Sequence, residues 1–404
     1  MKNLTEKKLS IDKSKWQAIK LGDVVAEPKE LVKNIKDEGI EHVVGLEHID
    51  SECVYLRRSA SIKESTIFTK KFSVNDVLFG RRRAYLKKAA QSKFSGICSG
   101  DITVMRAKEG LLPELLPFIV QNEKFFDYAV KHSAGGLSPR VKFKDLANYE
   151  FLLPPKEQQA KLAELLWAMD EVIEKELVVL RKSIKLLKGF VEDVIHGKYL
   201  NDNGFQKTKI GLIPFGWKLV KMEKIVLVKD GTHLTPKYTN KGIPFLRVTD
   251  IQSSNIDFEK IKFISKEEHS QLIKRCNPQK GDILYSKNGT IGVSKIVDWD
   301  WEFSIFVSLA LLRIKSKKNL NIDYLKLLLD SIHIKKEIYR RSKQGTITNL
   351  HLEEIRLFRV PLPPLCKQKE IADSVANINN SIYSIKNKLE ISKSLQKSLI
   401  NEVF

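Results

Sequence analysis

The residues with the clearest capacity for chemistry form a cationic cluster in the first half of the chain. Within residues 81–88, five side chains are basic and one is aromatic: Arg81, Arg82, Arg83, Tyr85, Lys87 and Lys88. Arginine can pair bidentately with O6 and N7 of guanine, and both arginine and lysine neutralise phosphate. The cluster therefore favours a nucleic-acid contact, with a solvated basic loop as the alternative for any single arginine.

A polar turn occupies the corresponding place in the second half. Residues 281–292 read GDILYSKNGTIG, in which a strand-like stretch runs into a tight turn that contains Lys287, Asn288 and Thr290. The glycines permit the positive φ of such a turn. We expect Lys287 and Asn288 at its tip, where Asn288 could hydrogen-bond adenine and Lys287 could reach guanine or phosphate.

Three further loops carry polar side chains suited to the same contact. They supply Arg140 in residues 132–140, Thr232 and His233 in residues 230–238, and Gln344, Thr346, Thr348 and Asn349 in residues 343–349. Short side chains on glycine-rich turns allow close approach to a phosphate backbone, although an ordinary hairpin has the same composition. His233 taken alone is more typical of a surface histidine than of a ligand.

These loops belong to two copies of one module. The segment PPKEQQAKLA at 154–163 returns as PPLCKQKEIA at 363–372, a spacing of 209 residues (363 − 154). Upstream the match continues at a spacing that falls to 201 between Trp16 and Trp217 (217 − 16), because insertions accumulate in loops. A repeat this long is not a solenoid unit. It predicts a duplicated domain followed each time by a helix, with one scaffold and different loops.

Each copy ends in a long helical pattern with a single apolar seam. The apolar positions recur at heptad spacing, at Leu166, Ile173, Leu177, Leu180 and Ile184 in the first copy and at Val375, Ile378, Ile382, Ile385 and Leu389 in the second. Beyond Leu389 the second pattern slips to 391, 395, 399 and 403. About 40 helical residues make a rod of ~60 Å, whose seam needs a partner. The simplest arrangement pairs the two helices antiparallel; the alternative packs each on its own domain.

Composition limits the class of protein and its partners. The chain has 404 residues, 42% of them hydrophobic, and a formal net charge of +21. A charge so far from zero favours a polyanionic partner, the alternative being lysine-rich codon usage. The four cysteines are isolated, so neither zinc spacing nor a disulfide framework is indicated. No signal peptide or membrane-spanning stretch is evident, and we expect a cytoplasmic protein.

Taken together, these motifs resemble the specificity subunit of type I restriction–modification enzymes. The resemblance rests on the order of Trp16, residues 45–49, 76–83 and 154–159 with their long helix, and then of Trp217, residues 244–251, 281–292 and 363–368 with theirs. The first half lacks the Gly-Thr-Ile-Gly turn and carries Arg81–Arg83 there. The resemblance therefore implies that the two halves read different DNA sequences.

The resemblance and the repeat together predict the fold class. We expect an α+β protein with an internal pseudo-two-fold repeat, in which two similar target-recognition domains are separated by two long antiparallel coiled-coil helices. The expected segments are target-recognition domain 1 at 1–153, a central spacer helix at 154–198, target-recognition domain 2 at 199–362, and a C-terminal spacer helix at 363–404.

What the resemblance implies about function is a non-catalytic targeting subunit. It would bind a bipartite duplex target and dock DNA methyltransferase subunits, expected to be two, and through them the restriction and translocase subunits. We find no methyltransferase tetrad, nucleotide-binding loop or HExxH motif, so S-adenosylmethionine, ATP and Mg²⁺ are expected on the partner subunits and no cofactor in this chain. The alternatives are a coiled-coil adaptor with a basic surface and, less favoured, an RNA-binding protein.

Overall fold

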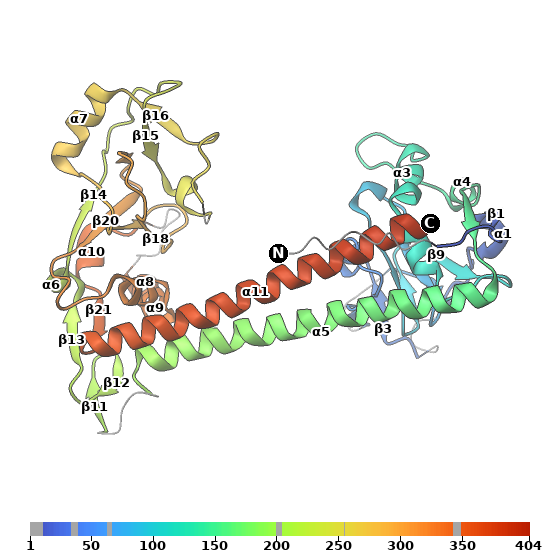
Figure 1. The fold of residues 1–404 in the computed structure, drawn as a ribbon, viewed down its shortest axis with the longest axis horizontal. Coiled ribbons are helices and arrows are strands. Elements are labelled where there is room, and N and C mark those ends of the chain that lie inside the picture. The colour runs from blue at the N-terminus through green and yellow to red at the C-terminus, as the bar shows by residue number, and fades with distance from the viewer. Residues whose placement is uncertain (1–10, 34–38, 63–66, 199–203, 254, 342–348) are drawn as a thin grey trace. The chain divides into compact units, whose positions relative to one another are not determined.

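The chain folds into two compact units, each of which includes part of both long helices. The computed structural model describes residues 11–33, 39–62, 67–198, 204–253, 255–341 and 349–404. Unit 1 comprises Met1–Val179 and Ile385–Phe404, and unit 2 comprises Leu180–Ser384 (Figure 1). The four segments predicted along the chain thus differ from these units, because each unit takes in one end of each long helix.

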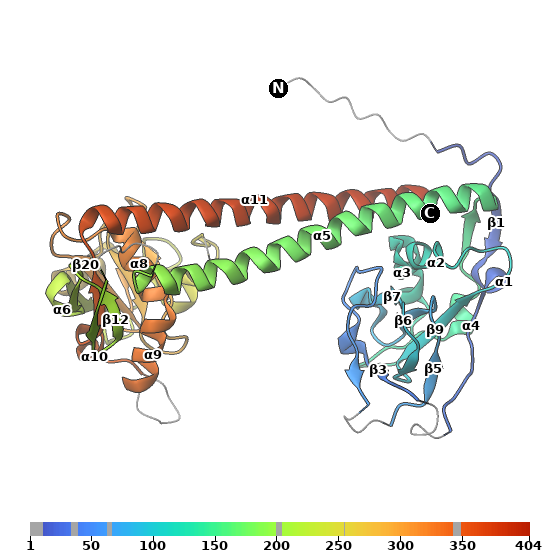
Figure 2. The same ribbon diagram turned by 90° about the horizontal axis from the view of Figure 1, so that it is seen from below.

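Unit 1 contains two β-sheets and a two-stranded ribbon. One sheet has the order β2-β9-β6-β7, the other β4-β3-β8-β5, and β1 pairs with β10 (Figure 2). Its strands are β1 (Gln17–Lys20), β2 (Val25–Ala26), β3 (His42–Val44), β4 (Ala60–Ser61), β5 (Lys70–Phe72), β6 (Val77–Gly80), β7 (Ala89–Gln91), β8 (Gly96–Cys98), β9 (Ile102–Ala107) and β10 (Glu150–Leu153). Its short helices are α1 (Leu21–Val24), η1 (Leu46–His48), η2 (Ala84–Leu86), α2 (Leu116–Gln121), α3 (Glu123–Lys131) and α4 (Phe143–Leu146).

Among the described residues, unit 2 repeats most of this plan, with three strands in place of four in its second sheet and three further elements. The sheet β14-β20-β17-β18 matches β2-β9-β6-β7, and β16-β15-β19 matches the second sheet, including its parallel pair. A hairpin, β11 (Phe205–Thr208) and β12 (Gly211–Pro214), and α7 (Lys266–Arg275) are added. The other elements are β13 (Lys218–Lys221), α6 (Met222–Ile225), β14 (Val226–Asp230), β15 (Ile243–Leu246), η3 (Val248–Ile251), β16 (Lys262–Ile264), β17 (Ile283–Ser286), β18 (Ser294–Ile296), β19 (Ser304–Ile305), β20 (Leu309–Ile314), α8 (Ile322–Asp330), α9 (Ile332–Arg341), α10 (Leu352–Arg356) and β21 (Arg359–Leu362).

The same buried ion pair braces the central sheet of each unit. In unit 1 the carboxylate of Asp76, which is 1% exposed, accepts from Nε and Nη2 of Arg106 at 2.7 and 2.8 Å. In unit 2 Asp282 and Arg313 repeat the contact at 2.7 and 2.6 Å. A bidentate guanidinium–carboxylate pair fixes both partners, so these matched residues of the repeat serve the scaffold.

The Pro-Pro-x-x-x-Gln motif also has a structural role. Gln159 accepts a hydrogen bond from the backbone N–H of Leu112 at 2.9 Å and donates to the carbonyls of Gly110 and Pro154. Gln368 makes the same three contacts, accepting from Asn321 N–H and donating to the carbonyls of Asn319 and Pro363. Because a buried amide must be satisfied, this glutamine fixes the angle at which each long helix leaves its sheet.

The two long helices are α5 (Lys156–Ile195) and α11 (Leu365–Val403). All ten predicted seam residues are buried or half-buried. The predicted slip to 391, 395, 399 and 403 is wrong at its first two positions, since Ile391 and Leu395 are 67% and 60% exposed, whereas Leu399 and Val403 are buried. The seam instead runs through Gln396, which is buried and donates to the carbonyl of Leu166 at 3.4 Å. A polar residue can occupy the seam because it finds a partner there.

The C-terminal end of each long helix contacts an equivalent short helix, α3 in unit 1 and α9 in unit 2. In unit 1 the Asn401 side chain of α11 accepts from the N–H of Glu123, the first residue of α3, at 2.9 Å. In unit 2 the Glu192 side chain of α5 accepts from the N–H of Ile332, the first residue of α9, at 2.7 Å. Positions 192 and 401 are 209 apart (401 − 192), so the repeat extends to these contacts.

A buried carboxylate on α5 makes unit 1 sensitive to pH. Burial raises the pKa of Asp170 to about 6, a shift that Glu174 reinforces and that Arg57, Lys93 and a hydrogen bond with Gln396 oppose. This pKa exceeds the value of ~3.9 in the unfolded chain, so between pH ~4 and ~6 the folded protein keeps a proton on Asp170 that the unfolded chain has lost. The free energy of unfolding therefore falls as pH rises through this range. Above this range the loss reaches about 3 kcal/mol at most.

Asp170→Asn is therefore expected to stabilise unit 1 at neutral pH. The amide needs no ionisation, so the gain should be about 1–3 kcal/mol above pH ~6.5 and absent near pH ~4. Hydrogen exchange of the α5 amides across this range measures it. Glu171→Gln, at an exposed neighbouring position, is the matched control and should leave the pH dependence between ~5 and ~7 unchanged. Equal effects of Asp170→Asn at both ends of the range would contradict the assignment.

In the part of the chain that the structure describes, no helix is both long and apolar enough to cross a bilayer.

Candidate nucleic-acid interface

The cationic cluster begins where β6 leaves the central sheet of unit 1. Backbone hydrogen bonds join Arg81 N–H to the carbonyl of Asp101 at 3.0 Å, and Val141 N–H to the carbonyl of Arg81 at 3.0 Å. A β-bridge then sets Arg82 opposite Arg140. We call this arrangement, residues 80–82, 101 and 138–141, loop frame 1. It brings together two arginines that the sequence places in separate loops.

The equivalent backbone arrangement exists in unit 2. Lys287 N–H donates to the carbonyl of Ser308 at 2.9 Å, and Leu350 N–H donates to the carbonyl of Lys287 at 2.9 Å. A β-bridge sets Asn288 opposite Asn349. This is loop frame 2, residues 286–288, 308 and 349–350. The two frames share their backbone hydrogen bonds and differ in the side chains that they present.

Loop frame 1 holds two guanidinium groups on one carboxylate. Arg140 Nε donates to Asp101 Oδ1 at 2.8 Å, Arg82 Nη1 donates to Asp101 Oδ2 at 3.2 Å, and Arg82 Nη2 donates to Ser138 Oγ at 3.1 Å. Burial of Asp101 opposes its ionisation, but the hydrogen bonds from Arg140 and Arg82 outweigh burial and lower the pKa of the carboxyl. The triad is therefore ionised at neutral pH and carries one net positive charge.

Loop frame 2 is uncharged at the bridge. The bridge pairs Asn288 with Asn349, and Oδ1 of each is buried without a hydrogen-bond partner among the described residues. Ser308 occupies the place of Asp101, at the spacing of 207 (308 − 101) found in this part of the repeat. An unsatisfied buried polar atom costs ~1–3 kcal/mol, so the pair retains hydrogen-bonding capacity that folding does not use.

The remaining cations of the first cluster have separate surroundings. Arg83 and Lys87 flank η2 with positive φ of 54° and 51°. Arg83 is exposed and donates to Ser138 Oγ at 3.3 Å, Tyr85 is 53% exposed, and Lys88 donates to the carbonyl of Leu46 at 2.7 Å. Of these, Arg83 and Tyr85 present the most side-chain surface for a ligand.

Lys87 belongs to an ion network that ties the cluster to α11. Its Nζ lies 3.2 Å from Glu123 and 3.9 Å from Glu52, and Lys397 Nζ lies 2.9 Å from each of the same carboxylates. Hydrogen bonds from Lys397 and Lys87 lower the pKa of Glu123. Lys87 thus has two acidic partners within unit 1, which reduces its availability to phosphate.

Lys287 does not lie at the tip of its turn as predicted. Its side chain is 5% exposed and its Nζ lies 3.7 Å from the buried Asp230, which also pairs with Arg275 at 2.7 Å. Burial lowers the pKa of Lys287, and the attraction of Asp230 opposes that shift. The prediction was wrong about exposure because Asp230 is distant in sequence; Asn288, Gly289 and Thr290 form the accessible part of the turn.

The other predicted residues of unit 2 are placed as follows. Thr232 donates to the carbonyl of Leu234 at 3.1 Å within its own loop. His233 is 57% exposed and approaches Asp230 at 3.2 Å. Gln344, Thr346 and Thr348 lie outside the described residues.

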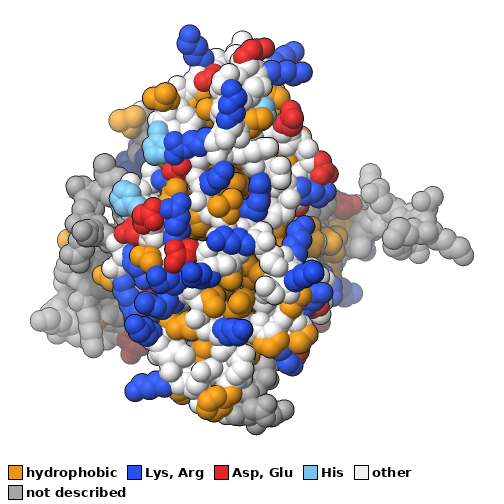
Figure 3. Space-filling view, turned by 90° about the vertical axis from the view of Figure 1, so that its left-hand side faces the viewer, with side chains coloured by type: hydrophobic (Ala, Val, Ile, Leu, Met, Phe, Trp, Pro, Cys, Tyr) orange, Lys and Arg blue, Asp and Glu red, His pale blue; other side chains and the backbone are white. Residues whose placement is uncertain are grey.

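Sequence reasoning missed the residues that support the frames, Asp101, Ser138 and Ser308. An acidic residue is not expected at a polyanion contact, so composition gives no signal for Asp101. Only the spacing of 207 residues, applied to Asp101 and Ser308, could have identified them as a matched pair. Figure 3 shows a face of unit 2, and on that face lysine and arginine side chains are more frequent than acidic ones.

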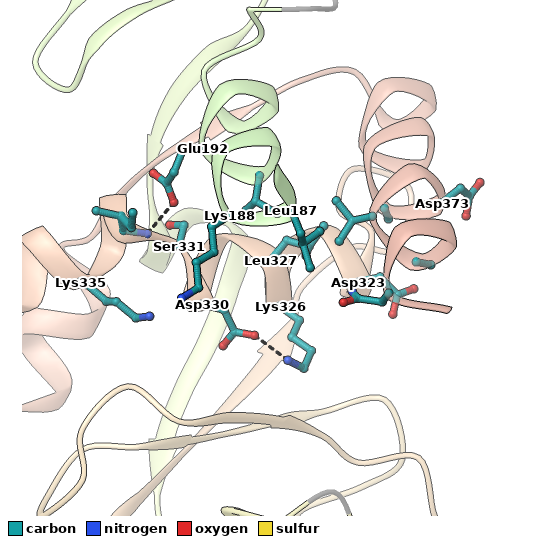
Figure 4. A pocket seen from close by; sticks show the side chains of 16 residues that line it. Leu187, Lys188, Glu192, Asp323, Lys326, Leu327, Asp330, Ser331, Lys335 and Asp373 are labelled. Atoms are coloured by element: carbon teal, nitrogen blue, oxygen red, sulfur yellow. Dashed lines mark hydrogen bonds and ion pairs between the residues drawn. The ribbon is translucent and has the colours of Figure 1, made fainter. Parts of the chain in front are cut away.

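Unit 2 also has an open cavity between its helices. The cavity of about 690 Å³ is lined by α5, α8, α9 and α11, with Leu187 and Leu327 in its wall and Lys326 paired with Asp330 at 2.6 Å (Figure 4). Ala376 lies in the lining. The counterpart of Ala376 in unit 1 is Trp167, 209 residues earlier (376 − 167). The ring of Trp167 meets the ring of Phe118 edge-on, with 5.1 Å between the ring centroids.

Comparison with known proteins assigns the family. The sequence profile of the type I restriction modification DNA specificity domain matches residues 13–180 and 214–392. The MjaVIII specificity subunit of Methanocaldococcus jannaschii is 24% identical over 402 residues, covering 96% of this chain and 91% of that protein. The EcoBI specificity subunit of Escherichia coli is 26% identical over 267 residues, covering 58% and 55%.

Solved structures show the same fold. A chain from a study of assembly and conformational transition in a type I R-M system has a TM-score of 0.60 at 21% identity, covering 96% of both chains. The S subunit of a type I restriction-modification system from M. genitalium has a TM-score of 0.56 at 12% identity, covering 99% of this chain and 98% of that one. Because the profile matches both halves of the repeat, this chain belongs to the type I restriction modification DNA specificity family.

Proposed function

We propose that this chain recognises a bipartite duplex DNA target, with each unit reading one half of it. The observation that carries the proposal is the repetition of one loop frame with different side chains, Arg82 and Arg140 in unit 1 and Asn288 and Asn349 in unit 2. A duplicated scaffold with unlike polar groups suits two unlike half-sites. The net charge of +21 supports a polyanionic ligand, because neutralised phosphates release counterions and supply sequence-independent affinity.

We further propose that α5 and α11 pair as an antiparallel coiled coil and determine the gap between the half-sites. Each helix begins in one unit and ends in the other, and the ten predicted seam residues are buried or half-buried. In unit 1 the contact of Gln396 with Leu166 supports an antiparallel register there. A helical segment of fixed residue number is a defined spacer at ~1.5 Å per residue.

In this proposal the chain performs no chemistry itself. It docks DNA methyltransferase subunits, and restriction subunits through them, and these partners supply S-adenosylmethionine, ATP and Mg²⁺. Base methylation requires an extruded base, so the partner needs access to the duplex that this chain has selected. The coiled-coil adaptor alternative keeps the helices but assigns no ligand to the loop frames.

The experiment is a titration of fluorescent duplex DNA with the full chain, alone and with its methyltransferase subunits, in 50–200 mM salt. Sequencing of modified bases in the native genome first identifies the target. We expect binding that prefers the target over random duplex, with log K falling by about 0.9 per phosphate neutralised for each unit of log salt. Binding without salt dependence or sequence preference would support the adaptor instead.

A matched pair of variants separates the contribution of the loop frames to DNA binding from the contribution of net positive charge. Arg82→Asn with Arg140→Asn removes two positive charges from loop frame 1. Arg181→Asn with Lys185→Asn removes two from exposed positions on α5. We expect the first variant to lose target preference and the second to lose little beyond the affinity carried by charge alone.

A further inference from the structure

We infer that the two bridged pairs are equivalent specificity-determining positions, with Arg82 and Arg140 directed at guanine in one half-site and Asn288 and Asn349 directed at adenine in the other. This inference rests on the proposed function and adds which residues read and which base class each pair selects. It also assigns Asp101 a role as a positioning residue. The steps that carry it are the shared backbone, the chemistry of each pair and the contrast between them.

The shared backbone makes the two pairs comparable. In both units the residue after the central strand accepts a hydrogen bond from the residue two positions before a short helix, Arg81 from Val141 before α4 and Lys287 from Leu350 before α10. The next residue then forms the bridge, at Arg82 and at Asn288. Since the main-chain hydrogen bonds coincide, a side chain at either bridge starts from the same local geometry. The side chain alone decides what each frame can recognise.

The pair in unit 1 has the groups and the support that guanine reading needs. Arg82 and Arg140 are 38% and 47% exposed, whereas Asp101 between them is 21% exposed. The Asp101 carboxylate accepts one hydrogen bond from each guanidinium, from Nη1 of Arg82 and from Nε of Arg140. Arginine loses rotamer freedom when it binds, and a fixed carboxylate reduces that cost in advance. Each oriented fork can then meet O6 and N7 of guanine.

The pair in unit 2 has the groups that adenine reading needs. An asparagine amide offers one acceptor and one pair of donor hydrogens, which match N6 and N7 of adenine. The Oδ1 atoms of Asn288 and Asn349 have no hydrogen-bond partner among the described residues. Buried polar groups are nearly always satisfied, so a bridged pair with two unsatisfied side-chain carbonyl oxygens indicates groups reserved for a ligand. Ser308, in the place of Asp101, adds no charge that would favour phosphate.

A phosphate clamp is the competing role for the arginine pair. Two guanidiniums on one carboxylate could hold a phosphate without reading a base. Lysine keeps the charge needed for phosphate but lacks the planar fork with which arginine meets guanine bidentately, and asparagine lacks both the charge and the fork. The test therefore compares substitution to lysine with substitution to asparagine.

The test uses the full chain assembled with its methyltransferase subunits and a library of random duplexes, from which bound DNA is selected and sequenced. For Arg82→Asn with Arg140→Asn, we expect guanine preference at positions of one half-site to fall by about 10- to 100-fold and the other half-site to be unchanged. Arg82→Lys with Arg140→Lys should keep the affinity carried by charge and lose a smaller part of that guanine preference. Asn288→Ala with Asn349→Ala should remove adenine preference in the other half-site only. Asp101→Asn should weaken the same guanine preference as the arginine variants, and thermal unfolding of each variant serves as the control for folding.

Each alternative result has a defined meaning. An asparagine variant of the arginine pair that keeps guanine preference, or any variant that weakens binding equally on all sequences, would overturn the inference and leave the proposed function standing. Loss of preference in both half-sites from one pair would also overturn it, because the pairs would then act through folding. If the unsubstituted complex selects no sequence at all, the proposed function itself fails.

Discussion

Removal of residues 399–404 is expected to unfold unit 1 while unit 2 stays folded. Leu399, Ile400, Val403 and Phe404 are at most 9% exposed and join the core formed by the first domain. Each buried apolar side chain contributes ~1.5–3 kcal/mol, so the loss is about 6–12 kcal/mol as an upper estimate. This is comparable with the whole stability of a domain, ~5–15 kcal/mol.

Hydrogen exchange with peptide resolution measures this result. Peptides from residues 11–179 should lose protection in the shortened protein, and those from 204–341 should keep it. Leu399→Ala and Leu395→Ala form a matched pair on the same helix, 9% and 60% exposed. The first should cost about 2–4 kcal/mol and the second under ~0.5 kcal/mol. Full protection of unit 1 without residues 399–404 would mean that α11 does not belong to its core.

Asp282→Ala is expected to cost about 3–5 kcal/mol in unit 2. The substitution leaves the Arg313 guanidinium without its bidentate partner and also removes the acceptor for Gln279 N–H at 2.7 Å. The carboxylate is 2% exposed, so water replaces these contacts poorly. Asp76→Ala should have the same effect in unit 1, because Asp76 accepts from Arg106 and from Ser73 N–H in the same geometry.

Denaturant unfolding, with hydrogen exchange to assign the unit, checks this expectation. Asp300→Ala is the control, since Asp300 forms an ion pair with Lys280 at 2.8 Å while 78% exposed. Exposed pairs contribute ~0–1 kcal/mol. A loss for Asp282→Ala no larger than that of the control would show that the buried pair does not brace the sheet.

Much of the fold could be predicted because the repeat provides two examples of each element. The corresponding segments 76–83 and 281–292 contain the central strands β6 and β17, and the paired segments at 154–163 and 363–372 mark the helix starts. The seam prediction failed at 391 and 395, where Ile391 and Leu395 are apolar yet exposed, and held at the buried Leu399 and Val403. The polar Gln396 takes the buried position through a hydrogen bond that composition does not reveal.

The candidate site was harder to predict because its geometry depends on contacts distant in sequence. Arg82 and Arg140 were identified as cations, but their pairing on Asp101 could not be read from either loop alone. The burial of Lys287 depends on Asp230, 57 residues earlier (287 − 230). Asn288 and Asn349 were both predicted contacts, and the structure adds that they face each other.

The return of α11 to the core of unit 1 has a consequence for the order in which a ribosome can complete the two units. Chains usually acquire structure from the first domain onward during synthesis. Here unit 1 needs residues 385–404, which are translated after all of Leu180–Ser384. Unit 1 therefore cannot complete its core until unit 2 has been translated. Leu115 and Leu116 belong to the same apolar cluster as Leu399. During that interval the apolar surface around them is open to chaperones and to self-association.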